Sequence, residues 1–90
     1  MGLPKGLRVT SSINSNHTIY KLYDTEIVKF NHIAGLLELQ SGGWLTKHTK
    51  KCMNLALTGT GYYVMQKGGQ WYVGSTKGFA PYTDGMKLAV

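Results

Sequence analysis

The amino-acid sequence predicts a small α+β protein, and three observations carry this prediction. Residues that favour β-strands gather in short runs between His17 and Gln40, one segment after Gly43 has helical spacing, and two apolar runs then flank a Gly-Gly pair. We therefore expect a small antiparallel β-meander, one helix, a β-hairpin and a short terminal strand, with the helix packed on the sheet.

Length and composition limit the chain to one folded unit. Its 90 residues, 42% of them hydrophobic, supply one core and leave no room for a second. Residues 1–16 mix Gly, Pro, Ser and Asn, which predicts a flexible or edge-strand N-terminal arm, and residues 17–90 are the predicted α+β domain. The chain has neither a signal-peptide pattern nor an apolar run of about 20 residues, so we expect an intracellular protein without a membrane partner.

The meander is expected in the first half of the chain. Thr18–Tyr23 and Ile27–Phe30 are rich in β-formers, and Asp24-Thr25 between them can turn. Leu36–Gln40 could be strand or helix by composition, but its shortness and the nearby glycines favour a third strand.

The helix is predicted over about residues 45–57, where apolar side chains recur at helical spacing. Thr46 can cap its first turn, and Gly59 can adopt the left-handed conformation that ends a helix. The side chains expected to pack on the sheet are Leu45, Cys52, Met53, Ala56 and Leu57. The side chains expected on the solvent face are Lys47, Lys50, Lys51 and Asn54.

The hairpin is predicted over about residues 62–73, with Gly68-Gly69 as a two-residue type I′ loop. This loop places Gln66 opposite Trp71 and Val64 opposite Val73 on one face of the hairpin, and Met65 opposite Tyr72 on the other. Both faces are apolar, so the sequence leaves open which one packs inward. Met86–Val90 is expected to form the terminal strand.

The charge distribution favours a polyanionic partner. Ten Lys and Arg against four Asp and Glu give a net charge of +6, and no acid lies between residues 39 and 83. The candidate polyanion-binding residues are Lys47, Lys50, Lys51 and Lys67. The alternative is that the lysines only form a solvent-exposed helix face that keeps the protein soluble.

The Ser41-Gly42-Gly43-Trp44 turn opens the helix and is a candidate anion site. Unpaired amides of a first helical turn attract negative charge, and Gly42, Gly43 and Thr46 shape this terminus. The alternative is that the glycines only reverse the chain while Trp44 fills the core.

Aromatic residues of the hairpin are candidate contacts. Tyr63 and Tyr72 lie with Met65 and Lys67 on a face that could stack unpaired bases, and Trp71, Tyr63 or Tyr72 could instead anchor a protein interface.

No catalytic, metal or cofactor site is expected. His48 and Cys52 could meet on one face of the helix, but Cys52 lies on the predicted core stripe, where free cysteine behaves as a small hydrophobe. Because Cys52 is the single cysteine, it can form neither an intrachain disulfide nor a thiolate zinc cluster, and the three histidines lack carboxylate partners at metal-ligand spacing.

Several motifs in a fixed order give the chain a family resemblance. They are Thr25-Glu26-Ile27-Val28-Lys29-Phe30, Leu39-Gln40-Ser41-Gly42-Gly43-Trp44-Leu45-Thr46, Thr49-Lys50-Lys51-Cys52-Met53-Asn54, Tyr63-Val64-Met65-Gln66-Lys67, Gln70-Trp71-Tyr72-Val73 and Asp84-Gly85-Met86. Over about residues 23–88 the chain resembles a set of small proteins encoded by tailed bacteriophages. It differs in the short link Leu57–Gly61 and in Cys52, where the set often has Arg. The resemblance implies a phage protein made in the cytoplasm of an infected bacterium, and it implies no particular activity.

Three functions remain as hypotheses for a non-enzymatic protein of this kind. The first is binding of nucleic acid or another polyanion through the basic helix face. The second is a protein-protein inhibitor or adaptor that acts on a host enzyme or defence complex, of the anti-CRISPR type for example. The third is a minor virion component. A homo-oligomer is compatible with each of them, because exposed strand edges can pair between subunits.

Overall fold

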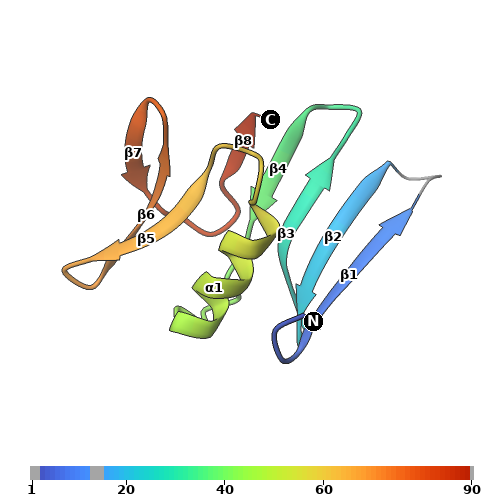
Figure 1. Cartoon of the computed structure of the whole chain (residues 1–90), viewed down its shortest axis with the longest axis horizontal. Helices are drawn as coiled ribbons and strands as arrows, with labels where there is room; N and C mark the ends of the chain where they lie inside the picture. Colours follow the sequence, from blue (N-terminus) through green and yellow to red (C-terminus); the bar gives the residue numbers. More distant parts are fainter. Residues whose placement is uncertain (1–2, 13–15, 90) are drawn as a thin grey trace.

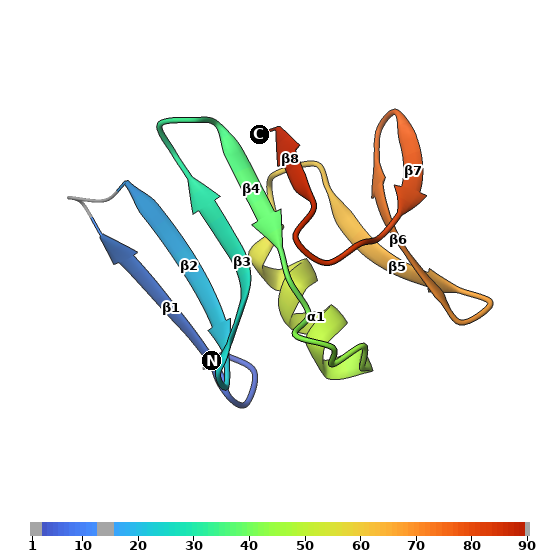
Figure 2. The ribbon, with the colours of Figure 1, turned by 180° about the vertical axis from the view of Figure 1, so that it is seen from behind.

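The computed structural model describes residues 3–12 and 16–89. Its elements are, in chain order, β1 (Leu7–Ser12), β2 (His17–Leu22), β3 (Thr25–Asn31), β4 (Leu36–Leu39), α1 (Lys47–Ala56), β5 (Tyr63–Lys67), β6 (Gln70–Ser75), β7 (Gly78–Pro81) and β8 (Lys87–Ala89). Two antiparallel sheets result, a five-stranded one in the order β1-β2-β3-β4-β8 and a three-stranded one in the order β5-β6-β7. Helix α1 lies between them (Figure 1), and the view from behind agrees (Figure 2). The predicted α+β class is confirmed.

The five-stranded sheet contains the predicted meander as β2, β3 and β4, flanked by two more strands. Strand β1 from the N-terminal segment forms one edge beside β2. Strand β8, predicted as the terminal strand, forms the other edge beside β4. The approach of β8 is fixed by two backbone hydrogen bonds, in which the Gly85 amide donates to the Leu39 carbonyl at 2.7 Å and the Leu39 amide donates to the Met86 carbonyl at 3.0 Å.

A bulge in β3 turns two successive side chains into the core. The pairing of β2 with β3 shifts between Tyr20 and Lys21, so that Val28 pairs with Tyr20 and Glu26 pairs with Lys21. Ile27 is the extra residue, and both Ile27 and Val28 are completely buried. Helix α1 covers this region with Thr49, Cys52, Met53 and Ala56.

Helix α1 begins at Lys47, two residues later than the start predicted from the apolar spacing. Thr46 is the N-cap, as predicted, and its hydroxyl accepts a hydrogen bond from the Thr49 amide at 3.2 Å. The prediction that Leu45 packs in the core is wrong, because Leu45 precedes the cap and its side chain is 55% exposed. The helix ends before Gly59, whose φ of +86° is the expected left-handed conformation.

The three-stranded sheet contains the predicted hairpin. Gly68 and Gly69 have φ values of +59° and +81°, as a type I′ loop requires, and the predicted pairing of β5 with β6 is confirmed. The face that carries Val64, Trp71 and Val73 packs inward, and all three side chains are buried. Strand β7 was not predicted from the sequence, because Gly78 and Pro81 at its ends are typical of a loop.

Candidate functional site

The predicted lysines of α1 occupy two different environments. Lys47 and Lys51, one helical turn apart, are exposed, whereas Lys50 is half-buried and leans toward the hairpin. The Lys50 ammonium donates to the Gln66 side-chain oxygen at 3.3 Å and lies 5.9 Å from the centre of the Trp71 ring. We call Lys47, Lys50 and Lys51 the lysine stripe.

Asn54 does not belong to the solvent face of α1, contrary to the prediction. Its side-chain amide donates to the Val64 carbonyl at 3.0 Å, and its side-chain oxygen accepts from the Val64 amide at 2.7 Å. The Asn54 side chain therefore makes the two hydrogen bonds to the Val64 backbone that a neighbouring strand would otherwise make. In this way it joins the helix to the three-stranded sheet.

Two of the four acidic side chains, Glu26 and Glu38, point away from the lysine stripe. Glu26 and Glu38 lie on the face of the five-stranded sheet that points away from α1, where they alternate with Lys21 and Lys29. Among the described residues one ion pair is formed, between Lys29 and Glu26 at 3.5 Å. Lys47, Lys50 and Lys51 therefore have no acidic partner in the described part of the chain.

The predicted aromatic contacts divide between the core and the surface. Trp71 is only 3% exposed and packs on Tyr82 with ring centres 5.6 Å apart, so it is a core residue rather than a surface contact. Tyr63 and Tyr72 point to the opposite side of the sheet, away from α1. There they join a group of exposed and half-buried side chains, the aromatic face, which consists of Tyr63, Met65, Lys67, Tyr72, Phe79 and Pro81.

Lys67, a candidate polyanion-binding residue together with the helix lysines, lies apart from them. Lys67 shares the aromatic face with Tyr63 and Tyr72 by strand register. The lysine stripe lies on the helix, which packs against the other side of this sheet.

The turn before α1 is tied to the segment before β8. The amide and the hydroxyl of Ser41 both donate to one carboxylate oxygen of Asp84, at 3.0 and 2.8 Å, and the Tyr82 hydroxyl donates to the same oxygen at 2.7 Å. The Ser41 hydroxyl also accepts from the Gly43 amide at 3.1 Å. Gly42 has a φ of +64°, and a Cβ there would lie 2.7 Å from the Thr25 hydroxyl oxygen. The turn therefore needs glycine at this position.

These hydrogen bonds perturb two ionisable groups. Burial alone would raise the pKa of the Asp84 carboxyl, but the donors from Tyr82 and Ser41 outweigh it and hold the pKa below its ordinary value. Burial, together with the adjacent Asp84 carboxylate, raises the pKa of the Tyr82 hydroxyl far above its ordinary value.

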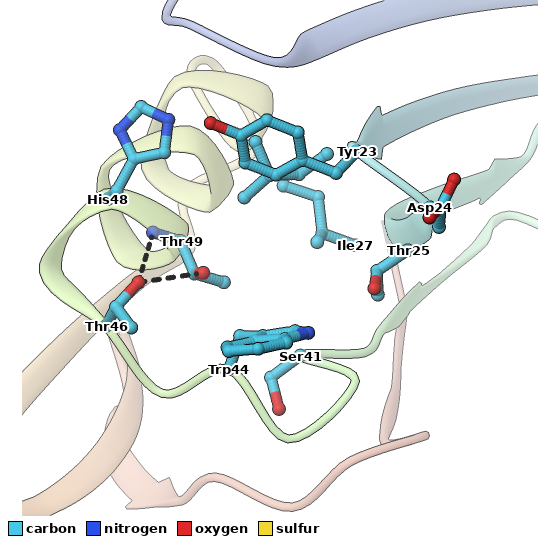
Figure 3. A pocket seen from close by; sticks show the side chains of 10 residues that line it. Tyr23, Asp24, Thr25, Ile27, Ser41, Trp44, Thr46, His48 and Thr49 are labelled. Atoms are coloured by element: carbon cyan, nitrogen blue, oxygen red, sulfur yellow. Dashed lines mark hydrogen bonds between the residues drawn. The ribbon is translucent and has the colours of Figure 1, made fainter.

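A cleft of about 580 Å³ opens beside this turn. The buried side chains of Leu22 and Ile27 line it. Tyr23 and Trp44 lie on opposite sides of it (Figure 3). Trp44 is 66% exposed and does not fill the core, so the core alternative for this residue is wrong. Thr46 and His48 border the cleft from the helix, and Asp24 and Thr25 border it from the β2–β3 turn.

His48 and Cys52 come together without forming a nucleophile and base pair. Burial raises the pKa of the Cys52 thiol, although nearby Lys51 opposes this, so the thiolate is disfavoured. The His48 Nε2 atom lies 2.7 Å from the Lys5 carbonyl oxygen, which can only accept, so Nε2 carries the proton. That nitrogen, 3.9 Å from the Cys52 sulfur, cannot accept the thiol proton.

The sequence profile of the Kyanoviridae Gp96 protein family matches residues 7–89, which is nearly the whole chain. The chain belongs to the Kyanoviridae Gp96 protein family. It is therefore a bacteriophage protein, as the motif resemblance implied. The comparisons found no similar protein among curated proteins and no similar solved structure. Within the described ranges, no helix has the length and apolar character needed to cross a bilayer.

Two surface features of this family member were missed by sequence reasoning. Phe79, 61% exposed, extends the aromatic face from a strand that was not predicted. Tyr23 was assigned only to a strand, yet it lies just after β2 with a φ of +52°, a conformation that is uncommon for a residue other than glycine. A tyrosine followed by Asp-Thr could have indicated an exposed aromatic ring in a turn.

Proposed function

We propose that this phage protein binds nucleic acid through the lysine stripe of α1. The observation that supports the proposal is that Lys47, Lys50 and Lys51 have no acidic partner within the described residues, whereas Lys29 on the five-stranded sheet pairs with Glu26. Phosphates can supply the missing counter-charge, and their binding releases the counterions that surround a nucleic acid.

The exposure of the stripe supports this proposal. Lys47 and Lys51 are exposed one turn apart on a helix whose N-terminus adds positive potential. Glu26 and Glu38 point away from α1 on the far side of the five-stranded sheet, so they do not repel a strand that follows the helix. Such binding in the cytoplasm of an infected cell is consistent with a phage protein.

The test is a titration of labelled single-stranded and duplex oligonucleotides, followed by fluorescence anisotropy at low salt. Lys47→Glu plus Lys51→Glu should abolish or strongly weaken binding. The control, Lys77→Glu plus Lys87→Glu, makes the same change in net charge at two other exposed positions. The proposal fails if the protein binds neither oligonucleotide, or if both double variants weaken binding equally.

A second candidate function is inhibition or bridging of a host protein complex through the aromatic face. This candidate is favoured by Tyr63 and Phe79, which are 45% and 61% exposed and lie on one side of the three-stranded sheet. Exposed aromatic residues are frequent anchors of protein interfaces. A pull-down from nuclease-treated host lysate should retain a defined partner that Tyr72→Ala plus Phe79→Ala releases and Lys47→Glu plus Lys51→Glu does not.

A further inference from the structure

We infer that the cleft between Tyr23 and Trp44 takes one unpaired base of a single-stranded nucleic acid, an inference that rests on the proposed function. The cleft volume of about 580 Å³ lies in the range of pockets that enclose small molecules. Its lining includes the buried apolar side chains of Leu22 and Ile27. Its two sides carry aromatic rings (Figure 3). A flat heteroaromatic ring matches this arrangement, because it can stack on the face of Trp44 and contact the edge of the Tyr23 ring (Figure 3).

The backbone of both aromatic residues is held in place, although their rings are exposed. The Trp44 amide donates to the Ser41 carbonyl at 3.1 Å, and Ser41 is itself fixed by Asp84. The Tyr23 amide donates to the Gly6 carbonyl at 2.9 Å, and the Tyr23 ring lies so close to Gly6 that a Cβ there would overlap it. A backbone that is fixed before binding loses little conformational entropy when a ligand enters. The uncommon positive φ of Tyr23 belongs to this arrangement.

The two ends of the cleft differ in charge, which orients a nucleotide. The helix end is bordered by Thr46 and His48, with Lys47 between them in the chain and the positive end of the helix dipole beside it. The opposite end is bordered by Asp24. A phosphate is therefore favoured at the helix end, toward the lysine stripe, and amino groups on the edge of the base are favoured toward Asp24.

The geometry selects single strands over duplexes. A base in a duplex is covered on both faces by its neighbours, so it cannot enter between Tyr23 and Trp44 without leaving the stack. An unpaired base is free to enter, and its phosphates then reach the lysine stripe. The cleft thus adds strand selection to the charge-driven binding proposed above.

The experiment compares a single-stranded oligonucleotide with a duplex of the same length by fluorescence anisotropy, using the full chain. Trp44→Ala should weaken single-strand binding by at least about fivefold and change duplex binding by less than about twofold. Trp44→Phe, which keeps a ring, should retain most of the affinity. Ile33→Ala is the control, because Ile33 is a large apolar side chain that is 78% exposed and lies outside both the cleft and the aromatic face. Circular dichroism of each variant checks that it folds.

The outcomes separate this inference from the proposed function. An equal effect of Trp44→Ala on both nucleic acids, or no effect on either, overturns the base-binding cleft while the lysine stripe stands. The base-binding cleft is also overturned if Ile33→Ala weakens single-strand binding as much as Trp44→Ala. If the unmodified protein binds neither nucleic acid, the proposed function fails and this inference fails with it.

Discussion

Ser41 and Asp84 are 43 positions apart in the chain, yet the amide and the hydroxyl of Ser41 both donate to one oxygen of the Asp84 carboxylate. Ser41 ends the segment that leaves β4, and Asp84 begins the segment that enters β8. The contact therefore joins the segment after β4 to the segment before β8. It also fixes the turn that carries Trp44. Two motifs that are far apart in the sequence form one structural unit.

Asp84→Asn should destabilise the protein at neutral pH and have less effect in acid. The folded-state pKa of Asp84 lies below its ordinary value of about 3.9, so the stabilisation is complete above about pH 4 and is lost as the pH falls through the folded-state pKa. We expect a loss of about 1–2 kcal/mol in the free energy of unfolding at pH 7, because the carboxylate is partly screened by solvent. Urea unfolding at pH 7 and at about pH 2.5 checks this, and a difference that does not depend on pH would contradict it.

Gly42→Ala should destabilise the protein more than Gly43→Ala. Both residues have positive φ, but an added Cβ meets Thr25 at position 42 and meets nothing within 4 Å at position 43. Gly43→Ala should cost about 1 kcal/mol from backbone strain alone, and Gly42→Ala should cost roughly twice as much. Thermal unfolding in a Thr25→Ala background should bring the two costs together, since the hydroxyl oxygen and the methyl group that crowd the new Cβ are then gone. Equal costs in the unmodified background would show that Thr25 plays no part.

Gly68→Asn should be tolerated, and Gly68→Val should destabilise the hairpin. The φ of +59° at Gly68 is a left-handed conformation that Asn adopts readily in Asn-Gly type I′ loops and that a β-branched residue resists. We expect a change within about 0.5 kcal/mol for Asn and a loss of about 1–2 kcal/mol for Val. Chemical denaturation measures both, and similar values for the two variants would argue against the type I′ loop.

Asn54→Ala should be among the most destabilising substitutions on α1. It removes both hydrogen bonds to the Val64 backbone and leaves a part-buried amide and carbonyl without these partners. The expected cost is about 2–3 kcal/mol, against less than about 0.5 kcal/mol for the exposed control Lys51→Ala. Comparable midpoints of urea unfolding for the two variants would contradict the role given to Asn54.

Local patterns in the sequence were sufficient to predict the elements that depend on local chemistry. The Gly68-Gly69 loop fixes the register of β5 and β6, and the hydroxyl of Thr46 caps α1, because both effects act within a few residues. The prediction that Leu45 packs in the core was wrong because the Thr46 cap begins the helix after residue 45.

Features that depend on distant contacts could not be read from the sequence. Asn54 looked like a solvent-face residue because its partner, Val64, comes from the next element. The exposure of Trp44 depends on the turn that the Ser41–Asp84 contact fixes. The lysine stripe and the aromatic face are separated because the hairpin packs inward through the face that carries Val64 and Trp71. Periodicity alone leaves that face undecided, because Val64 and Met65 are both apolar.

The salt dependence of oligonucleotide binding tests the central claim most directly. For the unmodified protein and a short single strand, the logarithm of the binding constant should fall linearly as the logarithm of the salt concentration rises. Lys47→Glu plus Lys51→Glu should lower both the affinity and the steepness of that dependence, by about 0.7 for each phosphate that the variant no longer binds. A slope and an affinity that are the same in the double variant, or no binding at the lowest salt concentration, would contradict the proposal that α1 binds nucleic acid.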